Sequence, residues 1–219
     1  AFRRIPTVRV EHLADLSQSS LDRIKNRFPG LQTSINPMEI IEMKELDAVA
    51  ICTPVETHLK LTREALLNDK HVFVEKPFGQ DPKSCMELCK LANSRNLNIM
   101  IGHVFLFNAS ILVLKEIIKS GELGGIRHLE AHRTNLGPVR KDVNAVWDLT
   151  SHDLSIFDFL LDSLPEAVSC VGSNQLDPEI EDTTYTTFKY SNSILAHAHA
   201  SWLNPRKVRQ ITVIGSKKM

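Results

Sequence analysis

The sequence predicts an α/β protein in two parts: a parallel sheet interleaved with helices, and then an α+β part with an open antiparallel sheet. In residues 1–103, short apolar runs alternate with amphipathic segments of about 10–15 residues, which is typical of βαβ units. In residues 104–219, strand-like runs follow one another without helices between them, which favours antiparallel pairing. We therefore place a boundary between two domains near residue 103.

The composition of the 219 residues limits the classes of function. The 26 lysines and arginines balance the 26 aspartates and glutamates, so we expect neither nucleic acid nor a membrane as a partner. No stretch reaches about 18 uninterrupted apolar residues, so no membrane-spanning helix is expected. The four cysteines are too few for a disulfide framework, and we expect reduced side chains in the core. Reduced thiols without a signal-peptide core favour a cytoplasmic location.

Strands and helices are expected to alternate through the first part. Strands are expected at residues 8–13, 48–52, 71–74 and 98–102. Helices are expected around residues 21–28, 37–43, 57–68 and 82–94. Gly30 is placed to end the first helix, and Asn36 and Asp81 are expected N-caps, each followed by a proline that suits the first helical turn.

Polar residues gather where the expected parallel strands end. In sheets of this kind ligands bind at the carboxyl ends of the strands. Those ends carry Asp15, Thr53-Pro54, Glu75-Lys76-Pro77 and Gly102-His103. Lys76 in particular could place a positive charge where an alkoxide develops, or it could belong to a surface turn.

The glycine-rich turn that usually opens a dinucleotide-binding sheet is absent. None of the nine glycines has the spacing G-x-G-x-x-G, whose backbone amides would hold a pyrophosphate. The simplest account is that the chain is a fragment beginning after that turn. Asp15 suits the acidic residue that binds the adenosine ribose, although a turn-forming aspartate is an equal alternative.

The second part is expected to begin with a helix and to end in successive strands. Helices are expected at residues 109–120 and 149–161, with a polar loop at 134–145. Strands are expected at residues 126–133, 167–172, 183–190, 194–202 and 208–214.

Polar side chains interrupt the apolar face of the helix that follows Trp147. His152 and Asp153 stand on this face, and Asp148 precedes His152 by one turn. An acid beside an imidazole is suited to proton transfer, because the imidazole titrates near neutral pH and the carboxylate can orient it. A capping Asp148 and a hydrogen-bonded core His152 remain the alternative.

Two histidines of a later strand, His197 and His199, point to one face and could bind a metal. No third ligand with suitable spacing stands out, so we expect no metal site there.

Taken together, four motifs resemble the Gfo/Idh/MocA oxidoreductases, the glucose–fructose oxidoreductase and inositol dehydrogenase family. The motifs are Thr53-Pro54 with His58, Glu75-Lys76-Pro77, Gly102-His103 leading to Phe107-Asn108, and Asp148 with His152-Asp153. The resemblance implies a partial NAD(P)-binding Rossmann domain in residues 1–103 and a substrate-binding α+β domain in residues 104–219, truncated at its C-terminus.

The resemblance also implies site residues. Lys76, Asp148 and His152 would be catalytic, with Lys76 and His152 flanking a nicotinamide and the reacting carbinol in one pocket, and the Lys76-Pro77 bond would be cis. NAD is the expected cofactor rather than NADP. The implied cofactor-binding residues are Asp15, Ser17, Thr53, Pro54, His58, Glu75, Lys76 and Pro77.

The loop around residues 133–148 is similar to the nucleotide-sugar branch of the family, which oxidises the 3-hydroxyl of a UDP-N-acetylhexosamine or its uronic acid. Arginines there could bind a carboxylate or a diphosphate bidentately, and solvated loop residues are the alternative. The implied substrate-binding residues are His103, Arg133, Asn135, Arg140, Asn144 and Trp147.

Two functions from different classes follow. The first is an NAD(P)-dependent oxidoreductase that transfers a hydride between a sugar carbinol and nicotinamide, with His152 or Lys76 as the base. The second is a non-catalytic sugar-binding or oligomerisation module on the same scaffold. In either case we expect a homo-oligomer formed through the C-terminal sheet, and weak NAD binding by this chain because the glycine-rich turn is missing.

Overall fold

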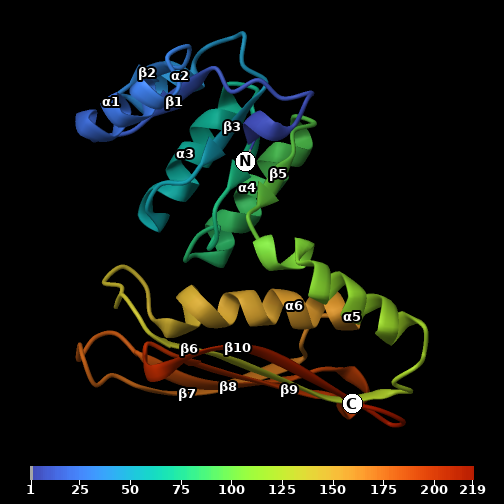
Figure 1. Ribbon diagram of the computed structural model, residues 1–219. Helices are drawn as coiled ribbons and strands as arrows, with labels where there is room; N and C mark the ends of the chain where they lie inside the picture. The colour runs from blue at the N-terminus through green and yellow to red at the C-terminus, as the bar shows by residue number, and fades with distance from the viewer. Residues whose placement is uncertain (1) are drawn as a thin grey trace. The chain divides into compact units, whose positions relative to one another are not determined.

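The computed structural model describes residues 2–219, and the chain divides into two compact units, Ala1–Gly102 and His103–Met219. Figure 1 shows the course of the chain. Within the described residues, no helix is long and apolar enough to cross a membrane.

The first unit contains only parallel strand pairs among its described residues. One sheet pairs β1 (His12–Ala14) with β2 (Gln32–Ser34). The other has the order β3-β4-β5, formed by β3 (Ala48–Ile51), β4 (His71–Val74) and β5 (Ile99–Ile101). The predicted parallel sheet is therefore confirmed, and the carboxyl ends of β3, β4 and β5 lie at one edge because Ile51, Val74 and Ile101 are in register.

Helices connect these strands, as predicted. They are α1 (Gln18–Arg27), α2 (Pro37–Ile41), α3 (Val55–Leu67) and α4 (Pro82–Ser94), after a short helix η1 (Phe2–Arg4). Asn36 caps α2 by accepting a hydrogen bond from the Met38 amide at 3.0 Å, and Asp81 caps α4 through the amides of Lys83 and Ser84. Both predicted caps are confirmed, because a short polar side chain satisfies amides that the first turn leaves open.

Two strands of this unit differ from the prediction. The first strand begins at His12 rather than at residue 8, and β2 was not predicted at all. Residues Gln32–Ser34 are polar and carry no apolar alternation, so their pairing with β1 depends on backbone hydrogen bonds that a pattern of side chains does not reveal.

The second unit is a five-stranded sheet covered by helices on one face, as Figure 1 shows for α5 and α6. Its helices are η2 (Val104–Phe107), α5 (Ala109–Lys119), η3 (Val146–Thr150), α6 (Ser151–Leu161) and η4 (Ser191–Ser193). Its strands are β6 (Ile126–Leu136), β7 (Ala167–Ser173), β8 (Thr183–Lys189), β9 (Leu195–Ser201) and β10 (Leu203–Gly215), in the order β10-β6-β9-β8-β7.

The sheet of the second unit is mixed rather than purely antiparallel. The pair β6–β9 is parallel, and the other three pairs are antiparallel. Between β6 and β7 the chain passes through α6, and the hairpins β7–β8–β9 then reverse direction twice. Strand β9 is therefore parallel to β6, the strand with which it pairs. The α/β fold class is confirmed with this correction.

Two local features of the second unit also differ from the prediction. Strand β6 continues to Leu136, where a loop was expected, because Leu136 pairs with Leu203 of β10. The helix expected from residue 149 begins earlier, with the π-helical turn Val146–Thr150 that runs directly into α6.

The expectation that the cysteines are core residues is wrong for three of them. All four thiols are free, and Cys52, Cys89 and Cys170 are exposed. Cys52 follows β3 at the open edge of its sheet, and Cys170 lies on β7, which has a neighbouring strand on one side only.

Candidate functional site

The first expected site residue, Asp15, follows β1 and is exposed. Its Oδ1 atom accepts a hydrogen bond from the Ser17 amide at 2.8 Å, and Ser17 is itself the N-cap of α1. The turn-forming role of Asp15 is therefore present in the structure. The Asp15 carboxylate is nevertheless exposed at the end of β1, where we expect a contact with the ribose.

The loops after β3 and β4 hold the next group of expected residues. Thr53-Pro54 follows β3 and precedes α3, and Glu75-Lys76-Pro77 follows β4. The Lys76-Pro77 peptide bond is cis, as the family resemblance implies.

His58 connects these two loops instead of facing a ligand. Its side chain is buried in α3, with Nε2 at 2.7 Å from the Thr53 carbonyl oxygen and Nδ1 at 2.8 Å from the Pro77 carbonyl oxygen. Both ring nitrogens face protein carbonyl groups, so the structure gives no support to a direct contact between His58 and a cofactor.

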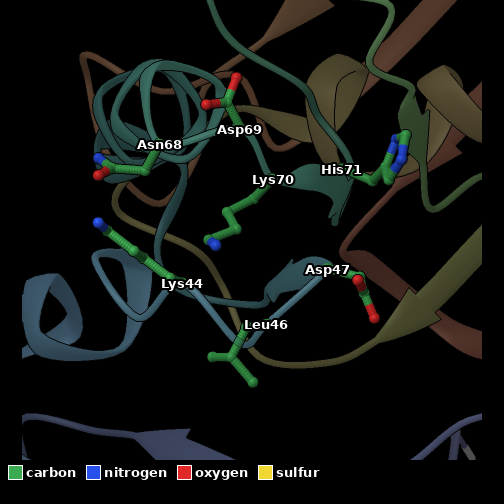
Figure 2. A pocket seen from close by; sticks show the side chains of 7 residues that line it. All are labelled: Lys44, Leu46, Asp47, Asn68, Asp69, Lys70 and His71. Atoms are coloured by element: carbon green, nitrogen blue, oxygen red, sulfur yellow. The ribbon is translucent and has the colours of Figure 1, made fainter.

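Two cavities of this unit lie away from the candidate site residues. Figure 2 shows one of about 400 Å³, with the Lys70 side chain reaching into it; its lining residues are Lys44, Leu46, Asp47, Asn68, Asp69, Lys70 and His71. A second cavity, of about 550 Å³, has Arg9, His12 and Gln32 among its lining residues. Both adjoin the amino ends of strands, whereas ligands of parallel sheets bind at the carboxyl ends.

In the second unit, Asp148 is held by two side chains. It lies in the π-helical turn, where its Oδ1 atom is 3.3 Å from Nη1 of Arg140 and its Oδ2 atom accepts a hydrogen bond from Nε1 of Trp202 at 3.1 Å. Trp202 is fully buried, so its indole N–H needs such a partner. These contacts fix the carboxylate one turn before His152.

Arg140 lies between two carboxylates. Its Nε atom donates to Oδ1 of Asp142 at 2.9 Å, and a second, short contact joins Nη2 to Oδ2 of the same residue. The hydrogen bonds with Asp142 raise the pKa of the Arg140 guanidinium. An anionic ligand group would compete with these carboxylates for a guanidinium that is only partly buried.

His152 lies near the start of α6 against an aromatic ring. The imidazole and the Phe105 ring are arranged edge to face, with centroids 4.8 Å apart and planes at 74°. The guanidinium carbon of Arg133 lies 4.3 Å from the centroid of the same Phe105 ring. Phe105 therefore contacts both the guanidinium of Arg133 and the imidazole of His152.

Arg133 is engaged in a buried ion pair rather than presented to a ligand. Its Nε and Nη2 atoms donate to Oδ1 of Asp153 at 2.9 and 2.7 Å, and the two side chains are 5% and 1% exposed. Burial raises the pKa of Asp153, and the hydrogen bonds from Arg133 oppose that shift. The ion pair joins α6 to β6, and the substrate contact expected of Arg133 stays a prediction.

The remaining expected substrate residues have local partners. Asn135 accepts a hydrogen bond from Arg209 at 2.6 Å. Asn144 donates to Glu181 at 2.8 Å and accepts from the Trp147 amide at 3.2 Å. The Trp147 side chain is 38% exposed, and His103 is half-buried at the start of the unit.

The structure brings together part of the expected set within each unit. In the first unit, His58 of α3 contacts the loop that contains Lys76 through the Pro77 carbonyl group. In the second, Asp148 lies in the π-helical turn that runs directly into α6, which contains His152. Sequence reasoning missed Phe105 and Trp202. A tryptophan at the end of a strand is a signal that could have been used, because its buried N–H requires an acceptor.

Among the described residues, no group of three or more His, Cys, Asp or Glu is placed to hold a metal ion. The strand histidines instead contact each other: His128 and His197 have centroids 4.9 Å apart, and His132 and His199 are 5.9 Å apart. Tyr185 stacks on His199 at 4.3 Å.

The first unit is a parallel sheet with polar strand ends, and the second is a mixed sheet whose covering helices carry an acid and an imidazole. Two family models match accordingly. An oxidoreductase family with an NAD-binding Rossmann fold matches residues 3–103, and the GFO/IDH/MocA C-terminal domain matches residues 111–219. The chain belongs to the GFO/IDH/MocA oxidoreductase family.

Individual relatives include enzymes that act on different substrates. The chain is 29% identical over 164 residues to a UDP-N-acetylglucosamine 3-dehydrogenase of Acidithiobacillus ferrooxidans, a match that covers 74% of this chain and 51% of that protein. It is 30% identical over 195 residues to an inositol 2-dehydrogenase of Rhodococcus erythropolis, covering 85% of this chain and 56% of that protein. The chain thus spans about half the length of the curated relatives it matches.

A solved structure supports the fold. The scyllo-inositol dehydrogenase of Lactobacillus casei, with bound NAD(H) and scyllo-inositol, has a TM-score of 0.87 at 19% identity, covering 98% of this chain and 68% of that one. At this identity the likeness shows the fold alone.

Proposed function

We propose that the protein containing this chain is an NAD-dependent oxidoreductase that acts on a sugar carbinol. The observation that carries the proposal is that Asp148 lies one helical turn before His152, with the carboxylate held by Trp202 and Arg140. The enzymes named among the relatives, a sugar-nucleotide dehydrogenase and an inositol dehydrogenase, support a polyhydroxylated substrate.

The residues of the first unit fit part of a nicotinamide dinucleotide. When bound, that cofactor supplies a hydride acceptor or donor. The exposed carboxylate of Asp15 would bind the adenosine ribose and would repel a 2′-phosphate, which favours NAD over NADP. The other contacts would come from Ser17, Thr53, Pro54, Glu75, Lys76 and Pro77. The sequence contains no G-x-G-x-x-G turn for the pyrophosphate.

The chain's own residues would handle the proton of the substrate hydroxyl. We assign His152 as its acceptor, because an imidazole titrates near neutral pH. The ammonium of Lys76 would stabilise the alkoxide that forms, and Asp148 would orient the imidazole and hold its positive charge.

The choice of substrate rests on the polar loop of the second unit. Arg140 is the arginine of this loop that remains partly exposed, and it would bind a carboxylate or diphosphate of a nucleotide sugar. Trp147, Asn144, Asn135 and His103 would line the sugar. The 3-hydroxyl of a UDP-N-acetylhexosamine or of its uronic acid is the reacting group that we propose.

Replacement of His152 by asparagine tests the proposed proton acceptor. Because asparagine cannot accept the proton, we expect kcat with the preferred sugar to fall by about 100-fold or more in the full-length enzyme. His71→Asn, which changes a histidine at the amino end of β4, is the matched control and should leave kcat within about twofold. Unchanged turnover in His152→Asn would remove His152 from the mechanism.

We also propose that a second copy of the chain covers the face of the C-terminal sheet opposite α5 and α6. On β6, β8 and β9 this face carries histidines, threonines and a tyrosine, and its formally charged residues at neutral pH are Glu130 and Lys189. Depletion of charge is typical of the centre of an interface. The mass in solution, measured by light scattering, should be that of an oligomer, and a monomer would contradict this assignment.

A further inference from the structure

The first unit contains a buried imidazole that the proposed reaction does not use. His58 is 1% exposed, and its two ring nitrogens lie 2.8 Å from the Pro77 carbonyl oxygen and 2.7 Å from the Thr53 carbonyl oxygen. A carbonyl oxygen only accepts hydrogen bonds. An imidazolium can therefore satisfy both contacts, whereas a neutral ring can satisfy one. In either state the ring links the loop after β3 to the loop after β4.

The contact with Pro77 is one of several that fix the backbone on both sides of Lys76. On the amino side, the Glu75 amide donates a hydrogen bond of 2.9 Å to the last residue of β3. On the carboxyl side, Phe78 is buried in the core of the unit. Gly79 lies so close to α3 that an added Cβ atom would come within 2.6 Å of a leucine side chain. Lys76 thus stands between anchored neighbours.

We propose that His58 is a positioning residue for Lys76 and acts through the Pro77 carbonyl group. The proposal rests on the proposed function, in which the Lys76 ammonium stabilises an alkoxide. A shift of the Pro77 backbone would move the ammonium, and a misplacement of about 1 Å can lower a rate by about 100-fold. The contact with Thr53 supports the loop after β3, and the contact with Pro77 sets the position of the lysine.

Two substitutions separate the contacts. In His58→Asn, the side-chain amide nitrogen takes the place of Nδ1 and can still donate to the Pro77 carbonyl group. In His58→Gln, the amide nitrogen takes the place of Nε2 and reaches the Thr53 carbonyl group instead. In the full-length enzyme we expect His58→Gln to lower kcat by about 10- to 100-fold with KM within about twofold. His58→Asn should keep kcat within about threefold of the wild type, because the Pro77 contact remains.

Amide hydrogen exchange over residues 76–80, read by mass spectrometry without substrate, provides a measurement that does not depend on activity. We expect faster exchange in His58→Gln and exchange close to that of the wild type in His58→Asn. If this difference appears and no sugar is oxidised, the proposed function fails while the positioning of the loop stands. If both variants unfold, or if they exchange alike, the ring serves only the fold of the unit and the positioning role is wrong.

Discussion

In the second unit, a histidine and an aspartate, His152 and Asp153, are buried near the start of α6. Arg133 donates two hydrogen bonds to Asp153, and the Phe105 ring packs edge to face against the imidazole of His152. The partners themselves could not be predicted. They come from β6 and η2, and the packing of those elements against α6 decides which side chain reaches the stripe.

The Arg133–Asp153 pair permits a prediction of stability. Substitution of Arg133 by methionine leaves a buried carboxylate without its cation, so we expect the free energy of unfolding to fall by about 3–5 kcal/mol in urea titrations. Lys218→Met removes the exposed pair with Glu122, whose side chains are 59% and 52% exposed, and is the matched control. A loss no larger in Arg133→Met than in the control would contradict the importance of the buried pair.

At the level of elements, apolar runs located β3, β4 and β5 to within about one residue at each end, because strands buried in a parallel sheet need apolar side chains on both faces. The same reasoning placed β6 and β9 but could not show that they are neighbours. The parallel direction of the two strands follows from the number of chain reversals between them. Their register sets His132 directly beside His199. The short polar strand β2 has no such side-chain signal.

The paired histidines of β6 and β9 predict a pH dependence of stability. Burial, and secondarily the charge of His132, lower the pKa of His199. As the pH falls below about 6.5, the unfolded chain therefore binds a proton more readily than the folded one, and stability is lost. We expect the free energy of unfolding to fall less between pH 7.5 and pH 5.5 in His199→Gln than in the wild type. Equal losses would show that His199 does not contribute.

For the whole molecule, cofactor binding can be predicted from what the 219 residues contain. They include candidate contacts for a ribose and for the nicotinamide end, but no G-x-G-x-x-G turn to hold the pyrophosphate. We therefore expect isothermal titration of this chain with NAD to give a dissociation constant weaker than about 1 mM. A chain that also carries such a turn should bind more tightly. Micromolar affinity of the present chain would contradict the expectation.

The parallel pairing of β6 with β9 also constrains how the second unit folds during synthesis on the ribosome. Both neighbours of β6, β9 and β10, lie far along the chain, so the ribosome releases β6 well before either of them. Loops of this length must close before the pairing stabilises the sheet, which slows folding. A nascent chain that stops before Leu195 leaves both edges of β6 without their partner strands, and such edges are sites of misassembly that chaperones protect.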